Sequence, residues 1–143
     1  MFKILIIGLP GSGKTTLAKI LSKKLNAKWI NADNIRKKYN DWDFSKEGVL
    51  RQAKRMADLS NKPTKKKILI CDFICPFEKG RKFFKPNILI WMNTMKKGRF
   101  KKNSIDHFFQ KPKNYDFMTK KKDAETFSKK IITKLNKSIF NKY

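Results

Sequence analysis

Short apolar runs alternate along the chain with longer stretches in which apolar side chains recur every three or four residues. The runs at residues 2–7, 68–72 and 87–92 have the length and composition of strands buried on both faces of a sheet. Two further strands are expected at residues 28–31 and 115–119. Strands that alternate with helices predict a parallel sheet covered on both faces. The helical periodicity predicts helices at residues 14–25, 33–39, 46–60, 76–84 and 123–140.

Residues 93–114 fit neither periodicity. They are mostly polar and basic, and Phe100, Phe108 and Phe109 interrupt them. No repeat or interdomain linker is visible anywhere in the sequence. We therefore expect a single domain over residues 1–143, in which residues 93–114 form a short basic lid.

A glycine-rich motif lies where the first strand should meet the first helix. Residues 8–15 read G-L-P-G-S-G-K-T and match the phosphate-binding pattern G-x-x-x-x-G-K-[ST]. Glycines let successive backbone N–H groups face phosphate oxygens, and the N-terminus of the next helix adds its positive end. We therefore expect ATP and Mg²⁺ here, with the Lys14 amine on the β- and γ-phosphates and the Thr15 hydroxyl on the metal ion. The residues expected to bind the nucleotide are Gly8, Gly11, Ser12, Gly13, Lys14, Thr15 and Thr16.

Two carboxylates follow expected strands. Asp72 ends the 68–72 strand, where it either helps to hold Mg²⁺ or caps the next turn. Asp33 follows the 28–31 strand at the same edge of the sheet. It either orients or deprotonates an acceptor hydroxyl, or serves as the N-cap of a helix at residues 34–39.

The net charge of +25 invites a nucleic-acid interpretation, but only five of the 36 basic residues are arginine. Lysine, asparagine, isoleucine and phenylalanine share A/T-rich codons, so codon bias accounts for most of the lysine. Weak, non-specific nucleic-acid binding at low salt is expected in either case. The retained arginines mark either phosphate or sulfate sites or surface salt bridges: Arg36, Arg51, Arg55 and Arg81. Three aromatic residues either stack on a base or close the core under a loop: Tyr39, Trp42 and Phe44.

Other features argue against secretion and membrane insertion. The apolar run at residues 4–7 is too short for a signal peptide, and no run approaches the ~18 residues of a membrane span. Cys71 and Cys75 have no second pair with which to form a zinc site, and we expect both to be reduced. A cytoplasmic protein is expected.

With these residues in view, the chain resembles the adenylylsulfate kinases, which phosphorylate the 3′-hydroxyl of adenosine 5′-phosphosulfate with MgATP. The family pattern D-G-D-N-[IV]-R corresponds to residues 31–36, its Phe-Ser pair to residues 44–45, and its F-I-S-P to residues 73–76. The resemblance implies a P-loop NTPase of the nucleoside-monophosphate-kinase-like type, a three-layer α/β sandwich with about five parallel strands. It also implies a kinase of sulfate assimilation, with Lys14 and Asp33 as catalytic residues. The implied acceptor-binding residues are Asp33, Arg36, Phe44, Gln52, Ile74 and Cys75.

Several positions depart from the family pattern. Asn31 replaces the first aspartate, Val49 a substrate-binding arginine, Gln52 an asparagine and Cys75 a serine. The acceptor is therefore left open between adenosine 5′-phosphosulfate, another small molecule and a 5′-hydroxyl polynucleotide. A nucleotide-binding protein without turnover is a further alternative, and a homodimer is left open.

Overall fold

The computed structural model describes residues 1–96 and 105–138. Their secondary structure alternates between strands and helices, as the sequence pattern predicts. In chain order the elements are β1 (Phe2–Ile7), α1 (Lys14–Lys24), β2 (Lys28–Asn31), α2 (Ala32–Tyr39), α3 (Lys46–Ser60), β3 (Ile68–Asp72), α4 (Glu78–Phe84), β4 (Ile88–Met92), α5 (Ile105–Phe108), β5 (Phe117–Thr119) and α6 (Ala124–Ser138).

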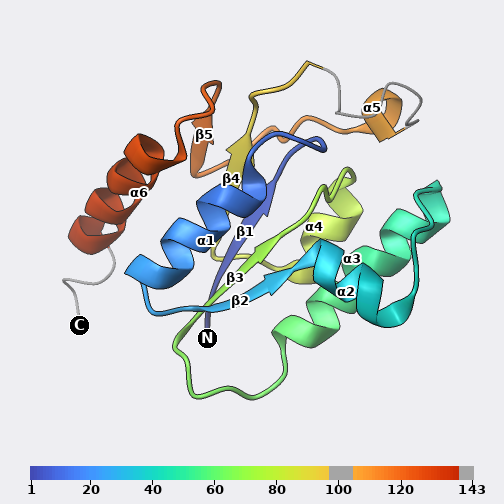
Figure 1. Ribbon diagram of the computed structural model, residues 1–143, viewed down its shortest axis with the longest axis horizontal. Coiled ribbons are helices and arrows are strands. Elements are labelled where there is room, and N and C mark those ends of the chain that lie inside the picture. The colour runs from blue at the N-terminus through green and yellow to red at the C-terminus, as the bar shows by residue number, and fades with distance from the viewer. Residues whose placement is uncertain (97–104, 139–143) are drawn as a thin grey trace.

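The strands form one parallel sheet in the order β2-β3-β1-β4-β5. Helices α1 and α6 lie side by side on one face, and α3 and α4 cover the other (Figure 1). This arrangement confirms the expected three-layer α/β fold with five parallel strands. The domain limits remain a prediction.

Each face of the sheet has its own apolar core, because alternate residues of β1 point to opposite sides. Ile4 and Ile6 pack with residues of α1 and α6, whereas Leu5 and Ile7 pack with residues of α3 and α4. β1 is the central strand and has no exposed side chain, so the packing on both faces holds its carboxyl end in place. The glycine-rich loop begins at that end. The phosphate-binding motif thus follows directly on four fully buried residues of the central strand.

Element limits differ from expectation in the less regular parts of the chain. β5 begins at Phe117 rather than at residue 115, and the short helix α5 lies where no element was expected. Helix α2 begins at Ala32, and its N-cap is Asn31, whose side-chain oxygen accepts a hydrogen bond from the Asn34 N–H. The alternative that made Asp33 the N-cap is therefore wrong. Residues 97–104 of the expected lid lie outside the described residues, and the lid remains a prediction.

Candidate active site

A cavity of about 920 Å³ opens at the carboxyl ends of β1, β2 and β3. The glycine-rich loop and the start of α1 form one wall, and the 72–76 segment forms the floor. The opposite wall comes from α2, the loop that follows it, and α3. The start of α6 closes the remaining end with residues 122–125. Parallel α/β sheets bind ligands at this edge.

The glycine-rich loop has backbone positions that only glycine occupies without strain or collision. Gly13 has a φ angle of 97°, a backbone conformation that residues other than glycine adopt only with steric strain. A Cβ atom at Gly8 would lie 2.7 Å from the carbonyl oxygen of Met92, so only glycine fits there. Within the described structure, the Ser12 Oγ is buried without a hydrogen-bond partner. An unpaired polar atom inside this loop fits a ligand with acceptor oxygens, such as a phosphate.

Lys14 and Thr15 begin helix α1. The Lys14 Nζ donates to the carbonyl oxygen of Leu9 at 2.9 Å, which folds the amine back over the loop. The Thr15 Oγ1 donates to the Asp72 Oδ2 at 3.0 Å. The two residues expected at the metal ion are therefore brought together.

Asp72 is 2% exposed and accepts hydrogen bonds on both carboxylate oxygens. The Trp29 indole Nε1 donates to Oδ1 at 2.7 Å, and the Asn31 amide donates to Oδ2 at 3.0 Å. Burial raises the pKa of the Asp72 carboxyl, while the donors from Trp29, Thr15 and Asn31 oppose that rise. A hydroxyl and a carboxylate at this distance are oxygen ligands of the kind that Mg²⁺ uses beside a nucleotide. The residues present therefore fit the expected cation.

This fit depends on the nucleotide as well as the protein. Within residues 1–96 and 105–138, no group of three or more His, Cys, Asp or Glu side chains could hold a metal ion. Mg²⁺ at nucleotide sites needs only one or two protein ligands, because phosphate oxygens and waters supply the others.

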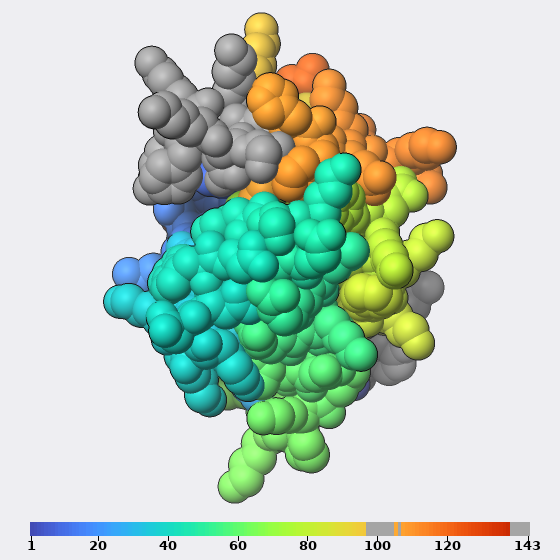
Figure 2. Space-filling model, turned by 90° about the vertical axis from the view of Figure 1, so that its right-hand side faces the viewer, coloured from blue at the N-terminus to red at the C-terminus, as the bar shows by residue number. Residues whose placement is uncertain are grey.

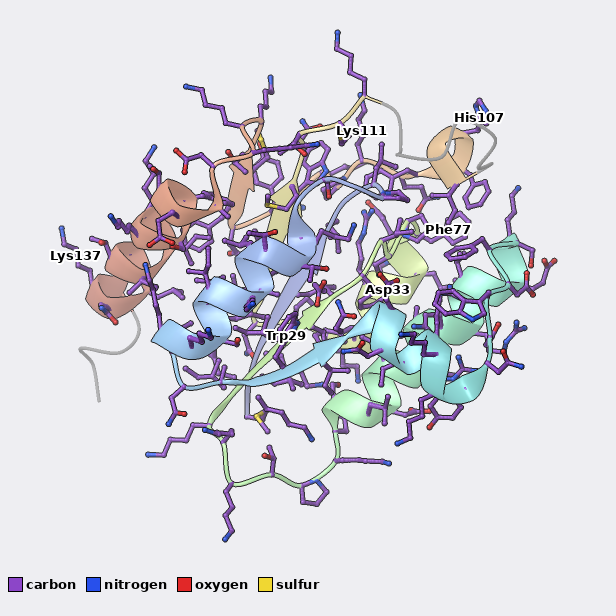
Figure 3. The ribbon with its side chains drawn as sticks, in the orientation of Figure 1. Trp29, Asp33, Phe77, His107, Lys111 and Lys137 are labelled. Atoms are coloured by element: carbon purple, nitrogen blue, oxygen red, sulfur yellow. The ribbon has the colours of Figure 1, made fainter. Side chains whose placement is uncertain are left out.

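Asp33 lies in the first turn of α2, is exposed, and lines the cavity (Figure 3). Its neighbour Asn31 serves two purposes, because its oxygen caps α2 while its amide donates to Asp72 and Thr15. The local fold thus turns the Asp33 carboxylate toward the cavity without requiring it as a cap.

Arg36 lines the cavity but is 4% exposed. Its Nη1 donates to the carbonyl oxygen of Asp41 at 2.8 Å, and its guanidinium carbon lies 4.2 Å from the centre of the Phe44 ring. Burial lowers the pKa of the Arg36 guanidinium. Arg36 therefore holds the loop after α2 in place, and Phe44 presents to the cavity a ring already stacked on that guanidinium.

Arg51 and Arg55 form ion pairs instead of lining the cavity. The Arg51 Nε lies 2.9 Å and the Arg55 Nη2 3.1 Å from the Asp41 Oδ2. Arg51 also pairs with Asp43 at 3.0 Å. Of the two alternatives for these arginines, the salt-bridge interpretation describes the structure.

The Arg81 side chain fastens two segments together from behind the cavity. Its Nε donates to the Cys75 carbonyl oxygen at 3.0 Å, and its Nη2 donates to the Gln110 carbonyl oxygen at 2.6 Å. The backbone N–H of Gln110 donates to the Pro76 carbonyl oxygen at 2.7 Å. Arg81 does not line the cavity, so it acts on the site through the backbone of residues 75–76.

The other expected acceptor residues all line the cavity. Gln52 is buried, with its amide donating to the Ala32 carbonyl oxygen and its side-chain oxygen accepting from Arg55. Cys75 has a left-handed φ of 43°, and burial raises the pKa of its thiol to about 12, so the thiol stays neutral. Both Cys75 and Cys71 are free, as expected.

An apolar cluster lies above the acceptor end of the cavity. Val49 packs with Leu9 and Ile105, and the Phe77 ring stacks on Phe108 at 5.3 Å. Figure 2 shows the segment that follows residue 104, in orange, resting on the loop before α3 and on the start of α3, in teal. Residues of α5 thus cover this end of the site.

Sequence reasoning missed two features of the cavity. Trp29 was not expected to contact Asp72, although its place two residues before the end of β2 carried a signal. The register of β2 and β3 pairs Asn31 with Asp72, so residues on the same face of β2 approach that carboxylate. The cavity is also lined by residues 122–125, of which only residues 123–125 were expected to have a structure, as the start of a helix. Asp123 accepts a hydrogen bond from the Thr126 N–H there. Within the described ranges, we find no helix with the length and apolarity to cross a membrane.

Comparisons with known proteins identify a family and proteins of the same fold. A family model described as adenylylsulphate kinase matches residues 1–96. The APS kinase of Mycobacterium tuberculosis, solved in complex with AMPPNP and APS, has a TM-score of 0.78 and 19% identity over 94% of this chain and 97% of that chain. The shikimate kinase of Acinetobacter baumannii, solved in complex with shikimate, has a TM-score of 0.68 and 17% identity over 97% and 96%. A cytidylate kinase of Sulfurisphaera tokodaii is 62% identical over 32 residues, a match that spans 22% of this chain and 18% of that protein.

Proposed function

Because the chain belongs to the adenylylsulphate kinase family, we propose that it uses MgATP to phosphorylate the 3′-hydroxyl of adenosine 5′-phosphosulfate. The observation that carries this proposal is one continuous cavity. It is lined at one end by the glycine-rich loop and the Thr15–Asp72 pair, and at the other by Asp33 and Phe44. The two ends have the chemistry that a phosphoryl donor and a hydroxyl acceptor require.

The proposed mechanism relies on positioning and charge neutralisation. Backbone N–H groups of the glycine-rich loop, which Pro10 alone lacks, and the Ser12 hydroxyl bind phosphate oxygens. The Lys14 amine leaves the Leu9 carbonyl oxygen to neutralise the β- and γ-phosphates. Thr15 and Asp72 would hold Mg²⁺, which supplies positive charge beside the transferring phosphate when bound.

Asp33 acts on the acceptor in this proposal. Its carboxylate is exposed in the cavity and accepts the proton of the attacking hydroxyl as the hydroxyl oxygen bonds to the γ-phosphorus and the bond from that phosphorus to ADP breaks. The Phe44 ring provides a flat surface for the acceptor's base, because Arg36 holds it from the other side. Gln52, Ile74 and Cys75 shape the rest of the acceptor wall.

A different small hydroxyl acceptor is the second candidate. Two observations at the end of the cavity where an anion would bind favour it. Val49 presents an alkyl group there, and the Arg36 guanidinium is already hydrogen-bonded to the backbone, so neither side chain is available to bind the anionic group of adenosine 5′-phosphosulfate. The same α/β framework in this family of folds carries kinases for unlike acceptors, as the shikimate complex of the Acinetobacter enzyme illustrates.

An ATPase-coupled screen with purified protein tests the proposal. Adenosine 5′-phosphosulfate, mononucleotides, shikimate, gluconate and a 5′-hydroxyl oligonucleotide are offered with MgATP. Product carrying a new 3′-phosphate from adenosine 5′-phosphosulfate supports the first candidate, and turnover of another acceptor alone replaces it with the second. A role in sulfate assimilation, a cytoplasmic location, a homodimer and weak nucleic-acid binding remain parts of the proposal.

A further inference from the structure

The cavity has an unequal supply of positive charge. Among the described residues that line it, the cations are Lys14, Arg36, Lys37 and Lys122. Lys14 belongs to the glycine-rich loop, and Lys122 lies at the far end beside Asp123 and Glu125. Of these four described cations, Arg36 and Lys37 lie at the acceptor end.

Arg36 is a poor candidate for binding a ligand anion. Its Nη1 donates to the Asp41 and Asp43 carbonyl oxygens at 2.8 and 3.4 Å, and one face of its guanidinium covers the Phe44 ring. Releasing it would leave those carbonyl groups without a donor, which costs about as much as the new contact would return.

Lys37 is the cation whose charge remains available there. Its side chain is exposed, and across the described part of the chain it makes no hydrogen bond or ion pair. Lys37 follows Asp33 by four residues in α2, so both side chains lie on one face of the helix, about 6 Å apart along its axis. The two residues do not pair with each other within 4.0 Å.

We propose that Lys37 binds the anionic group of the acceptor while Asp33 receives the proton of its hydroxyl. This inference rests on the proposed kinase function and names the substrate class: a small molecule that carries both a hydroxyl and a phosphate, sulfate or carboxylate group. Three apolar side chains, Trp42, Phe44 and Val49, line the same end of the cavity, so Lys37 supplies a charge that these side chains lack. As an exposed point charge on a flexible stem, it binds an anion in a salt-dependent way.

The test compares Lys37→Gln with Lys38→Gln in the full chain. Lys38 is the next residue of α2, is also exposed, and does not line the cavity. With adenosine 5′-phosphosulfate as acceptor, we expect Lys37→Gln to raise the acceptor KM about twofold to fivefold. The KM for ATP should not change, and Lys38→Gln should match the wild type. Lys37→Arg should restore most of the lost affinity, and the increase of the acceptor KM with salt should be weaker in Lys37→Gln than in the wild type.

The outcomes separate this inference from the proposed function. If the wild type phosphorylates adenosine 5′-phosphosulfate and Lys37→Gln behaves like Lys38→Gln, the role of Lys37 is overturned while the kinase assignment stands. If the screen finds shikimate or gluconate instead, the same variants are measured with that carboxylate. An uncharged acceptor would overturn the inference. Acceptor binding without turnover is followed through Trp42, which is 48% exposed at the rim of the cavity, with ADP present. A wild type that binds none of the anionic compounds refutes both proposals.

Discussion

Replacing Trp29 by phenylalanine should lower the stability of the protein and loosen the position of Asp72, without changing a residue that lines the cavity. The substitution keeps an aromatic ring against the core and removes the N–H group that donates to the Asp72 Oδ1 at 2.7 Å. Asp72 is 2% exposed, so water cannot easily replace the lost donor. A hydrogen bond to a charged group contributes about 1.5–3 kcal/mol to stability. The free energy of unfolding should fall by that amount, which for a domain of this size lowers the Tm by roughly 3–12 °C.

A double-mutant cycle isolates the Trp29–Asp72 bond from the change in ring size. Chemical unfolding is measured for the wild type, Trp29→Phe, Asp72→Asn and the double variant. Because the amide of Asp72→Asn carries no charge, the second substitution should cost clearly less in that background. Residues that do not interact show coupling energies below about 0.5 kcal/mol. A value in that range would therefore refute the proposed contribution of the Trp29–Asp72 hydrogen bond. Trp29→Phe should also bind Mn²⁺ or Mg²⁺ more weakly in the presence of ADP, since Asp72 loses one of the three side-chain donors that orient it.

Three further predictions concern separate parts of the molecule. Lys14→Ala should lose about 10²-fold or more in kcat/KM for ATP turnover, and unchanged turnover in a variant with a native circular dichroism spectrum would refute the site. Val49→Arg should lower the KM for adenosine 5′-phosphosulfate but also lower the Tm, because Val49 is 5% exposed in an apolar cluster; an unchanged KM would remove this position from acceptor binding. The guanidinium groups of Arg51 and Arg55 hold the pKa of the Asp41 carboxyl well below its usual range, so the stabilisation is full above about pH 4 and is lost as the pH falls through the native pKa. Unfolding measured from pH 6 to pH 2 should show this loss, and Asp41→Asn should flatten the profile in that range.

The parts of the fold that follow from periodicity were predictable. β1, β2 and β3 and the helices α1 and α3 lie within a residue of their expected limits, because strong apolar runs and helical stripes define them. The placement of Thr15 and Asp72 at one edge of the sheet was predictable too, because parallel strands end at the same edge. Their direct contact also requires β1 and β3 to be neighbours, which the sequence pattern did not predict.

The use made of each arginine was not predictable. Arg36, Arg51 and Arg55 find their partners in residues 41–43, a loop without periodicity whose path depends on how α2 and α3 pack. The carbonyl oxygens that bind Arg36 belong to the backbone, which leaves no trace in the residue types. The sequence shows which residues are cationic. Which of them are already paired with residues 41–43, and so cannot bind a substrate anion, depends on the three-dimensional path of that loop.

The buried guanidinium of Arg81 links the segment that covers the acceptor end of the cavity to residues 75–76, which line it. It is bonded at once to the carbonyl of Cys75, which lines the acceptor end, and to that of Gln110, which directly follows the segment that covers Val49. Lifting that segment would pull on the backbone of residues 75–76 through Arg81. A movement that opens the acceptor end of the cavity would then also shift the residues that line it. Entry of the acceptor and the strength of its binding would therefore change together.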